Sequence, residues 1–588
     1  MDKQAFFDGQ VFDAYRWFGA HIENQSVIFR VFAPNAAKIT VTGAFNSWKE
    51  DALQQDGRSG FWSVSVPGAQ VGQFYKYRIY AQDGTVTEHC DPYGFAMELR
   101  PGCCSVITDL SAYTFTDADW MAARTASPAA PVNIYELHLG SWLQDATDQN
   151  GWYRYDTIAD RLIPYLREHG FTHVEFLPLS EHPFDGSWGY QNTGFFAPTS
   201  RYGTPAQLKA LIDRLHHAGI GAIMDFVPVH FAVDSYGLAR FDGTPLYEYP
   251  HADVGESEWG SYNFIHSRRE VRCFLQSAAN YWLEEFHFDG LRMDAVSRLI
   301  YWQGDPARGV NGDTLEFLKN LNRGLKERHP TALLIAEDST TYPGVTHPID
   351  ADGLGFDYKW DLGWMHDTLC YFQTPPEERP QHRDQLLFSM QYFSNEQYLL
   401  PFSHDEVVHG KAAIVQKMWG ADLTDKYAQA RALYLYMFTH PGKKLNFMGN
   451  ELGLLTEWNE AAALDHSFEH GPFHTFFCAL GQVYRAHPAL HCDYETDNFR
   501  WIEPQDGAPC VFAWERCGGG ERLLAVCNLS DQAQPFSAAP PSVRLLLHTD
   551  WTRFGGGTKE TDPLFFNISD NISISLPKFS AVLLQIDA

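Results

Sequence analysis

The chain has 588 residues, of which 45% are hydrophobic and 15% aromatic, and its 73 acidic and 44 basic side chains give a net charge of −29. This acidity makes nucleic acids and anionic membrane surfaces poor partners, and the apolar content argues against a disordered chain. The sequence contains neither a run of about 20 apolar residues that could span a membrane nor a signal-like N-terminal segment.

The first 115 residues alternate between apolar and polar positions, with Pro and Gly at the breaks. Strands are predicted over residues 27–32, 38–42, 61–66 and 74–80. Period-two alternation with such breaks is typical of a β-sandwich. We therefore predict an N-terminal β-sandwich over residues 1–115 and a linker over 116–131, which contains a low-complexity run rich in Ala and Pro.

The pattern changes after residue 131. Apolar runs typical of strands begin near Ile134, Val174, Ala222, Leu291, Leu333, Phe356, Tyr398 and Leu445. Helical patterns separate most of these runs, for example over residues 204–219, 268–287 and 314–327. Eight β-then-α units over about 350 residues predict a (β/α)₈ TIM barrel, here residues 132–490, rather than a doubly wound sheet. Residues 491–588 return to strand patterns and predict a C-terminal β-sandwich.

Charged side chains close four of the predicted barrel strands. They are Asp225 and His230, Arg292 and Asp294, Glu337 and Asp338, and His404 and Asp405. The active site of such a barrel lies at the C-terminal ends of its strands. Several carboxylates with cationic partners suit glycosidic bond chemistry, which needs one nucleophile and one acid. A cation site, or ion pairs that simply close the mouth of the barrel, are the alternatives.

Four segments that contain these residues resemble the signature segments of the α-amylase superfamily. They are residues 225–230, 290–296, 336–340 and 402–411, the last being closest to the glycogen branching enzymes. The same resemblance extends through residues 135–142, 181–191, 197–203, 439–444 and 457–459. Residues 19–21, 31–35 and 45–48 resemble the glycogen-binding sandwich that precedes the barrel in this family, and 574–577 resemble its C-terminal sandwich. The resemblance therefore covers nearly the whole chain.

The resemblance implies a 1,4-α-glucan branching enzyme, which cleaves an α-1,4-glucan chain and transfers it to a glucose 6-hydroxyl with retention. It implies that Asp294 is the nucleophile, that Glu337 is the general acid and then the base, and that Asp405 binds sugar hydroxyls and favours the distorted ring. The resemblance also implies that Arg292 orients Asp294, and that His230 and His404 bind the same sugar. It implies further that Asp225 supports the site and that Tyr190 stacks on the ring. The expected partner is an α-1,4-glucan such as glycogen or an amylose-like chain.

Two other function classes stay open beside this one. A hydrolase on the same barrel, trehalose-releasing or debranching, would generally lack the segment 404–411, and a non-catalytic glycan-binding scaffold would have lost one of the three carboxylates. The chain also departs from the family after the eighth strand, around Glu451, and in a shortened loop at 301–312. These departures leave the transferred chain length and the choice of acceptor open.

Five tryptophans are candidates for stacking on sugar rings, because an aromatic face matches the apolar face of a sugar. Trp48 and Trp62 lie in the N-terminal sandwich, and Trp188, Trp259 and Trp458 lie in the barrel, where a place in the core is the alternative. No cofactor and no catalytic metal are expected, although a structural calcium is left open. The ten cysteines are scattered without a Cys-x-x-Cys pair, which indicates reduced thiols and a cytoplasmic protein. A monomer is expected, with an oligomer left open.

Overall fold

The computed structural model describes residues 1–502, 508, 510–539, 542–562, 565–568 and 571–586. The chain divides into two compact units. The first unit comprises residues 1–124, 138–160 and 175–357, and the second comprises 125–137, 161–174 and 358–588.

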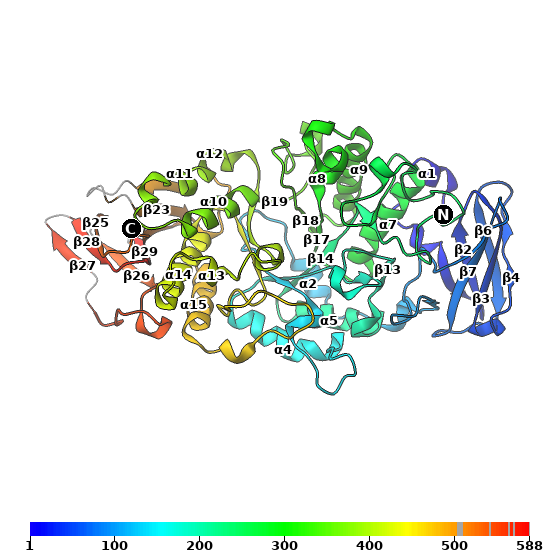
Figure 1. The fold of residues 1–588 in the computed structure, drawn as a ribbon, viewed down its shortest axis with the longest axis horizontal. Coiled ribbons are helices and arrows are strands. Elements are labelled where there is room, and N and C mark those ends of the chain that lie inside the picture. Colours follow the sequence, from blue (N-terminus) through cyan, green and yellow to red (C-terminus); the bar gives the residue numbers. More distant parts are fainter. Residues whose placement is uncertain (503–507, 509, 540–541, 563–564, 569–570, 587–588) are drawn as a thin grey trace. The chain divides into compact units, whose positions relative to one another are not determined.

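The N-terminal residues form a β-sandwich, as predicted. One sheet has the order β1 (Gly19–Glu23), β2 (Ser26–Phe32), β6 (Phe61–Pro67) and β5 (Gln54–Gln55). The other has the order β4 (Asp51–Ala52), β3 (Ala36–Gly43), β7 (Phe74–Ala81) and β8 (Val86–His89), with β9 (Ser105–Val106) also paired to β7 (Figure 1). Val27, Phe29 and Val31 alternate with more exposed neighbours along β2 and are buried, which explains the period of two in the sequence.

The segment predicted as a linker is partly helical. Helix α2 (Ala118–Ala123) forms within it, and Trp120 Nε1 donates a hydrogen bond of 2.9 Å to Asp289 Oδ1. Arg124 Nη1 lies 3.3 Å from the same carboxylate oxygen. The first part of this segment is therefore held by side-chain contacts within the first unit, which a low-complexity composition does not reveal.

Eight strands close into a barrel, which confirms the predicted fold class. Their order around the barrel is β10 (Asn133–Leu137), β11 (His173–Phe176), β14 (Gly221–Phe226), β17 (Gly290–Met293), β18 (Leu333–Ala336), β19 (Tyr358–Trp360), β20 (Tyr398–Phe402) and β21 (Lys443–Phe447). The long helices between and after them are α4 (Tyr155–Glu168), α5 (Pro205–His217), α7 (Arg269–Glu285), α9 (Gly312–Arg328), α10 (Leu362–Gln373), α14 (Leu423–Thr439) and α15 (Pro472–Ala486). The parallel pairing of β10 with β21 brings the first and last strands together within the second unit.

One of the eight expected units lacks its helix. The connection between β18 and β19, residues 337–357, contains only the 3₁₀ turn Ile349–Ala351. This segment carries Pro343 and Pro348 together with three glycines. Proline removes a backbone donor and glycine raises the entropic cost of a helix, so this composition disfavours one.

Helix α5 shows how local sequence sets an element boundary. The backbone N of Gln207 donates to Thr204 Oγ1 at 3.4 Å, and the Gln207 side-chain oxygen accepts from the Thr204 backbone N at 2.9 Å. Pro205 occupies the first helical position, where no intrahelical donor is needed. The helix predicted over 204–219 is confirmed.

The C-terminal residues form the second predicted sandwich. One sheet has the order β22 (Phe499–Ile502), β23 (Val511–Gly518), β24 (Glu521–Asn528), β29 (Ser580–Ile586) and β26 (Val543–His548). The other has the order β25 (Gln534–Ala539), β28 (Asn571–Leu576) and β27 (Phe565–Ile568). Its core includes Val511, Leu524, Val526, Phe536 and Leu584.

All ten cysteines lie in the described part of the chain, and none of them is disulfide-bonded. Among the helices of the described residues, none combines the length and the apolar character that crossing a bilayer requires.

Candidate active site

Three neighbouring strands of the first unit end side by side. In the parallel ladders, Asp225 of β14 lies opposite Arg292 of β17, and Met293 of β17 lies opposite Ala336 of β18. Asp294 and Glu337 are the next residues along β17 and β18. Since side chains two positions apart point to the same side of a strand, Arg292 and Asp294 face the same way.

Arg292 joins the carboxylates at these strand ends. Its Nη1 donates to both carboxylate oxygens of Asp225, at 2.8 and 2.7 Å, and to Asp294 Oδ1 at 3.0 Å. Its Nη2 lies 3.1 Å from Glu337 Oε2. The planar guanidinium thus contacts Asp294 and Glu337 at the same time, through its two terminal nitrogens.

The Arg292 guanidinium keeps its positive charge although it is buried. Burial would lower the pKa of this guanidinium, but the charge of Asp225, followed by Tyr190, Glu337 and Asp294, raises it well above its ordinary value. The cation therefore persists although the side chain is only 2% exposed. The guanidinium takes the place among these carboxylates that a metal ion would need, so the geometry favours an ion-pair site over a cation site.

The three carboxylates differ in their access to solvent. The side chain of Asp225 is 1% exposed, that of Asp294 is 12% exposed, and that of Glu337 is 22% exposed. Tyr190 donates from its hydroxyl to Asp225 Oδ2 at 2.6 Å, which adds to the bonds that Asp225 accepts from Arg292. Asp225 is thus occupied by protein donors, while Asp294 and Glu337 keep an accessible surface.

The backbone after Asp294 also holds Glu337. Ala295 has a left-handed φ of 47°, and its backbone N donates to Glu337 Oε2 at 2.7 Å. The backbone N of Val296 donates to the Glu337 carbonyl at 2.8 Å, and the backbone N of Glu337 donates to the Met293 carbonyl at 3.1 Å. A non-glycine residue with positive φ is uncommon and costs backbone strain, and such strain gathers at functional sites.

Glu337 and Asp338, which the strand-end pattern alone could not tell apart, lie in different surroundings. Asp338 is 2% exposed, and its carboxylate accepts from the backbone N of Thr340 at 3.0 Å and from Thr340 Oγ1 at 3.1 Å. Asp338 therefore shapes the turn after β18, whereas the Glu337 carboxylate faces Arg292.

The remaining predicted residues of the first unit are Tyr190 and His230. The Tyr190 ring is half-buried, with the Arg292 guanidinium carbon 5.9 Å from its centroid. His230 begins β15 (His230–Phe231) and is 3% exposed, and burial, followed by the charge of Arg298, lowers its pKa to about 3. Its ring lies 5.1 Å from that of Trp259, which is 45% exposed. His230 is therefore a neutral hydrogen-bonding group near physiological pH.

In the second unit, His404 and Asp405 belong to a group built on a residue that sequence reasoning missed. Glu136 of β10 is buried, and its carboxylate accepts from Ser403 Oγ at 2.9 Å, from His404 Nδ1 at 2.6 Å and from the His404 backbone N at 3.1 Å. His404 Nε2 lies 3.4 Å from Asp405 Oδ1, and the Asp405 side chain is 59% exposed. Glu136 thus fixes the His404 ring. A single charged residue inside a strand that is otherwise uncharged was the signal for Glu136.

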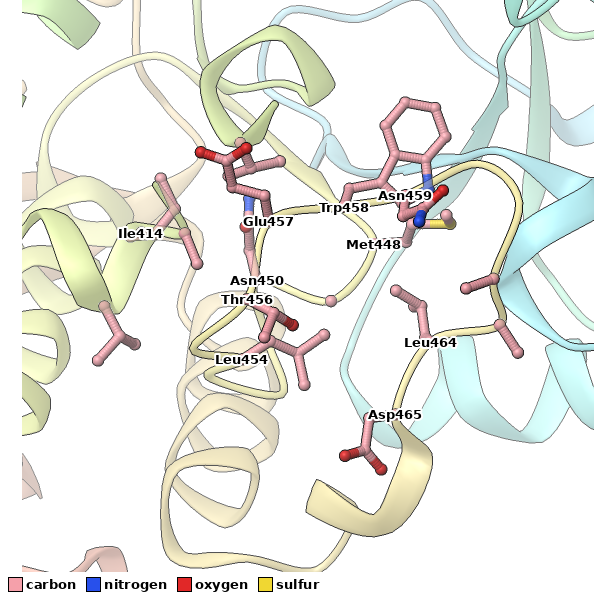
Figure 2. Close-up of a pocket in the computed structure, with 16 residues that line it drawn as sticks. Ile414, Met448, Asn450, Leu454, Thr456, Glu457, Trp458, Asn459, Leu464 and Asp465 are labelled. Carbon is pink, nitrogen blue, oxygen red and sulfur yellow. The ribbon is translucent and has the colours of Figure 1, made fainter. Parts of the chain in front are cut away.

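The segment that follows β20 is held by the Glu-Trp-Asn segment at 457–459. Glu457 accepts from the backbone N of Gly410 at 3.1 Å and of Ala412 at 2.6 Å, and the backbone N of Trp458 donates to the Val407 carbonyl at 3.0 Å. Beside these contacts lies a cavity of about 290 Å³, shown in Figure 2. Its lining includes Met448, Asn450, Trp458, Asn459 and Leu464. Two segments that resemble the family separately are therefore joined here.

Glu451, in the segment that departs from the family, is a structural residue. It is fully buried and accepts from the hydroxyls of Tyr135 at 2.8 Å and Tyr165 at 2.5 Å, and from Asn446 Nδ2 at 3.2 Å. Burial raises the pKa of its carboxyl. Its surroundings leave no surface from which it could contact a substrate directly.

The candidate tryptophans divide by exposure. Trp62 is 6% exposed and donates from Nε1 to the Ala33 carbonyl at 2.9 Å, so the prediction that it stacks on sugar is wrong. Trp458 is 9% exposed, and its ring centroid lies 5.0 Å from that of Phe447, which favours the alternative that Trp458 is a core residue. Trp188 is half-buried, and Trp48 and Trp259 are 48% and 45% exposed. Of these five residues only Trp62 lies on a strand, β6, and period-two alternation could not identify which face of that strand is covered.

Three family models match the chain in the order of the domains. A carbohydrate-binding module 48 (isoamylase N-terminal domain) matches residues 17–94, an alpha amylase catalytic domain matches 144–242, and an alpha amylase C-terminal all-beta domain matches 501–587.

Curated relatives match from end to end. The chain is 40% identical over 612 residues to the 1,4-alpha-glucan branching enzyme GlgB of Geobacillus stearothermophilus, with 100% of this chain and 95% of the relative covered. It is 40% identical to the enzyme of the same name from Synechococcus sp. (strain JA-3-3Ab), with 100% and 82% covered, and 39% identical to that of Bacillus cereus (strain G9842), with 100% and 94% covered.

Solved structures share the fold at lower identity. A putative alpha amylase from Salmonella typhimurium superposes with a TM-score of 0.72 at 20% identity, covering 97% of this chain and 100% of the other. Apo pullulanase from Paenibacillus barengoltzii superposes with a TM-score of 0.74 at 20% identity, covering 99% and 98%. These likenesses support the architecture alone.

Proposed function

This chain belongs to the 1,4-α-glucan branching enzyme family, and we propose that Asp294, Glu337 and Asp405 carry out its reaction. As a branching enzyme it cleaves an α-1,4 link, retains one fragment and transfers it to a glucose 6-hydroxyl, which creates an α-1,6 branch. The transfer proceeds with retention, so it requires two displacements at the same anomeric carbon.

In the first displacement, Asp294 attacks the anomeric carbon while Glu337 gives its proton to the departing 4-oxygen. The glucan chain becomes a β-linked ester of Asp294, and the other fragment leaves with the proton. In the second displacement, Glu337 removes the proton from an incoming 6-hydroxyl, whose oxygen breaks the ester and restores Asp294. The two inversions leave the α configuration unchanged.

The observation that carries this proposal is the contact of one Arg292 guanidinium with both Asp294 and Glu337. The guanidinium fork fixes the orientation of Asp294, the proposed nucleophile, and of Glu337 beside it. The bond from the Ala295 backbone N restricts the Glu337 carboxyl to one position. Asp225, which is buried, accepts hydrogen bonds from the guanidinium with both carboxylate oxygens and so holds Arg292 in place.

The remaining roles follow from the chemistry of each group. The exposed Asp405 carboxylate is suited to accept hydrogen bonds from sugar hydroxyls, and His404, fixed by Glu136, can donate to the same sugar. In the first unit, His230 is proposed to hydrogen-bond to the substrate, and the half-buried Tyr190 ring is proposed to stack on a sugar ring. Hydrogen bonds to charged groups contribute about 1.5–3 kcal/mol each, which is enough to fix a ring in a distorted conformation.

The product of amylose treatment tests the activity directly. We expect many new α-1,6 links for each new reducing end, because a transferase passes the cleaved chain to another sugar rather than to water. Both quantities can be measured together, the links by NMR or debranching and the ends by a reducing-sugar assay. Reducing ends that rise as fast as the links would contradict a transferase and favour a hydrolase on the same barrel.

The N-terminal sandwich is proposed to bind the glucan polymer through Trp48. This ring is 48% exposed, and Trp48 lies within the match to the carbohydrate-binding module. Trp48→Ala should weaken binding to glycogen about 3- to 10-fold, since an aromatic contact contributes roughly 1 kcal/mol. Activity on short maltooligosaccharides should not change. Affinity electrophoresis in glycogen and rates on short chains measure the two effects.

The matched control is Ile22→Ala, because Ile22 is also 48% exposed in the same sandwich but has no ring. Equal loss in both variants would contradict stacking by Trp48. A point substitution is preferable to deletion of the sandwich, since Cys273 Sγ of helix α7 donates to the Phe6 carbonyl and Tyr15 donates to Glu284 at 2.9 Å. The N-terminal residues thus help to bury the barrel helix.

The ten unpaired cysteines are consistent with a reducing compartment and support a cytoplasmic enzyme. We propose that it acts as a monomer on glycogen or amylose-like chains.

A further inference from the structure

Three side chains with metal-binding atoms meet in the second unit, among residues that have no part in the reaction. His169, His474 and Cys478 each offer one ligand atom, and these atoms lie within 4.8 Å of one another. His169 and His474 are buried, and Cys478 is partly exposed. In the part of the chain that the structure describes, no other group of three such residues has this geometry.

The backbone brings these residues together. His169 directly follows helix α4, and His474 and Cys478 are one turn apart on helix α15, so both lie on one helix face. Helix α15 approaches His169 closely at Gly481, where a Cβ atom would lie 1.9 Å from the His169 carbonyl oxygen. Glycine at this position permits the close approach.

His169 is already in the state that a metal ligand needs. Its Nδ1 donates to the Tyr165 carbonyl at 2.8 Å, which places the ring proton on Nδ1 and leaves a lone pair on Nε2. The ring is fully buried, and within the described residues Nε2 has no hydrogen-bond partner. Burial lowers the pKa of His169 to about 3, so the ring stays neutral. A buried nitrogen left without a partner requires an explanation, and an imidazole whose other nitrogen donates to a backbone carbonyl is the usual arrangement of a metal ligand.

The other two groups are compatible with this role. Cys478 Sγ lies 3.8 and 3.9 Å from the two ring nitrogens of His474, so either nitrogen can turn to a shared ion. His474 Nδ1 accepts a long bond of 3.3 Å from the backbone N of His470, which an ion at Nδ1 would displace. Burial, followed by Glu168 and Glu451, raises the pKa of Cys478 to about 12, so the thiol holds its proton near neutral pH and a metal ion would have to displace it.

We propose that His169, His474 and Cys478 form a Zn²⁺ site that joins the end of helix α4 to helix α15. Two imidazoles and one thiolate are the donor set that Zn²⁺ prefers, and they leave a fourth tetrahedral position for water. The partly exposed Cys478 gives the ion a route of entry. The site is separate from the branching reaction.

Metal titration of the full-length protein tests this proposal. Added Zn²⁺ should bind with one more equivalent in the wild type than in Cys478→Ser, as measured by calorimetry and by metal analysis after dialysis. Co²⁺ added in place of Zn²⁺ should produce a thiolate-to-metal charge-transfer band that Cys478→Ser abolishes. His474→Ala should weaken binding at least about 100-fold, more than the 10- to 100-fold cost of altering residues that only support a ligand.

The chain contains a matched control. His366 and Cys370 lie one turn apart on helix α10, with Cys370 Sγ 3.6 Å from His366 Nε2, but they are not part of the three-residue group. Cys370→Ser should keep both the zinc equivalent and the cobalt band. Equal metal binding in the wild type and Cys478→Ser, or loss of the band in Cys370→Ser, would overturn the proposal. Cys478→Ser changes one atom at a partly exposed position, so it should fold normally.

Discussion

Asp294→Asn should abolish branching, with kcat reduced on the order of 10⁴-fold or more, the scale of loss when a nucleophile is removed. The amide cannot form the ester, although its oxygen can still accept the 3.0 Å bond from Arg292 that orients the side chain. Because the substitution conserves shape at a position that is 12% exposed, the melting temperature should stay within a few degrees of the wild type. Rates on amylose and thermal unfolding measure the two effects.

The control for this variant is Asp338→Asn. Asp338 is a second carboxylate at the end of a barrel strand, and its oxygens accept hydrogen bonds from Thr340 in the turn. We expect it to keep most of the branching activity and to lose some stability. Substantial branching by Asp294→Asn would show that the nucleophile is another residue, and equal inactivation of both variants would contradict the distinct role of Asp294.

Glu337→Gln should fail in a different way. It should lose about 10²- to 10⁴-fold on glucans, because the proton donor for a sugar leaving group is gone. An α-glucosyl fluoride needs no such donor, so it should still load Asp294, and the ester should then accumulate because no base activates the acceptor. Mass spectrometry of the digested protein should find the sugar on the peptide that contains Asp294.

Azide distinguishes this outcome from simple inactivation. As an anion it needs no base, so it should release the trapped sugar as an α-glucosyl azide and restore turnover of the fluoride. Asp338→Asn, treated in the same way, should accumulate no ester. A sugar found on Asp338 or Asp405 would refute the assignment of Asp294.

Sequence patterns located the strands of the barrel and the charged residues at their ends. The barrel could be predicted because each strand is a short apolar run and most are followed by a helical repeat, and both are local patterns. The helix expected after β18 was wrong, although Pro343, Pro348 and the glycines between residues 337 and 357 carried the signal. Because these residues disfavour a helix, their number in this segment argues against the helix that was expected there.

Contacts between distant parts of the chain were beyond sequence reasoning. Every residue of β10 is buried, so no alternation shows that Glu136 points toward His404 rather than elsewhere. The same limit applied to Trp62, whose exposure depends on the loop that Ala33 belongs to. The proposed zinc ligands are even farther apart in the sequence, and the His169 and His474 rings come into contact only because two helices pack together.

The contacts between helix α14 and the C-terminal sandwich restrict which domains of this enzyme can be exchanged with those of relatives. Every residue of this helix from Ala428 to Thr439 is buried. Trp514 and Arg516 of β23 donate hydrogen bonds to the Thr439 carbonyl, at 3.2 and 2.9 Å. In the other direction, Arg431 of the helix donates to the Thr549 carbonyl at 2.7 Å. A chimera cut between barrel and C-terminal sandwich would separate these donors from their acceptors. A buried charge left unpaired costs several kcal/mol, comparable with the whole stability of a domain. Recombination would therefore succeed only where α14 and its sandwich are inherited together.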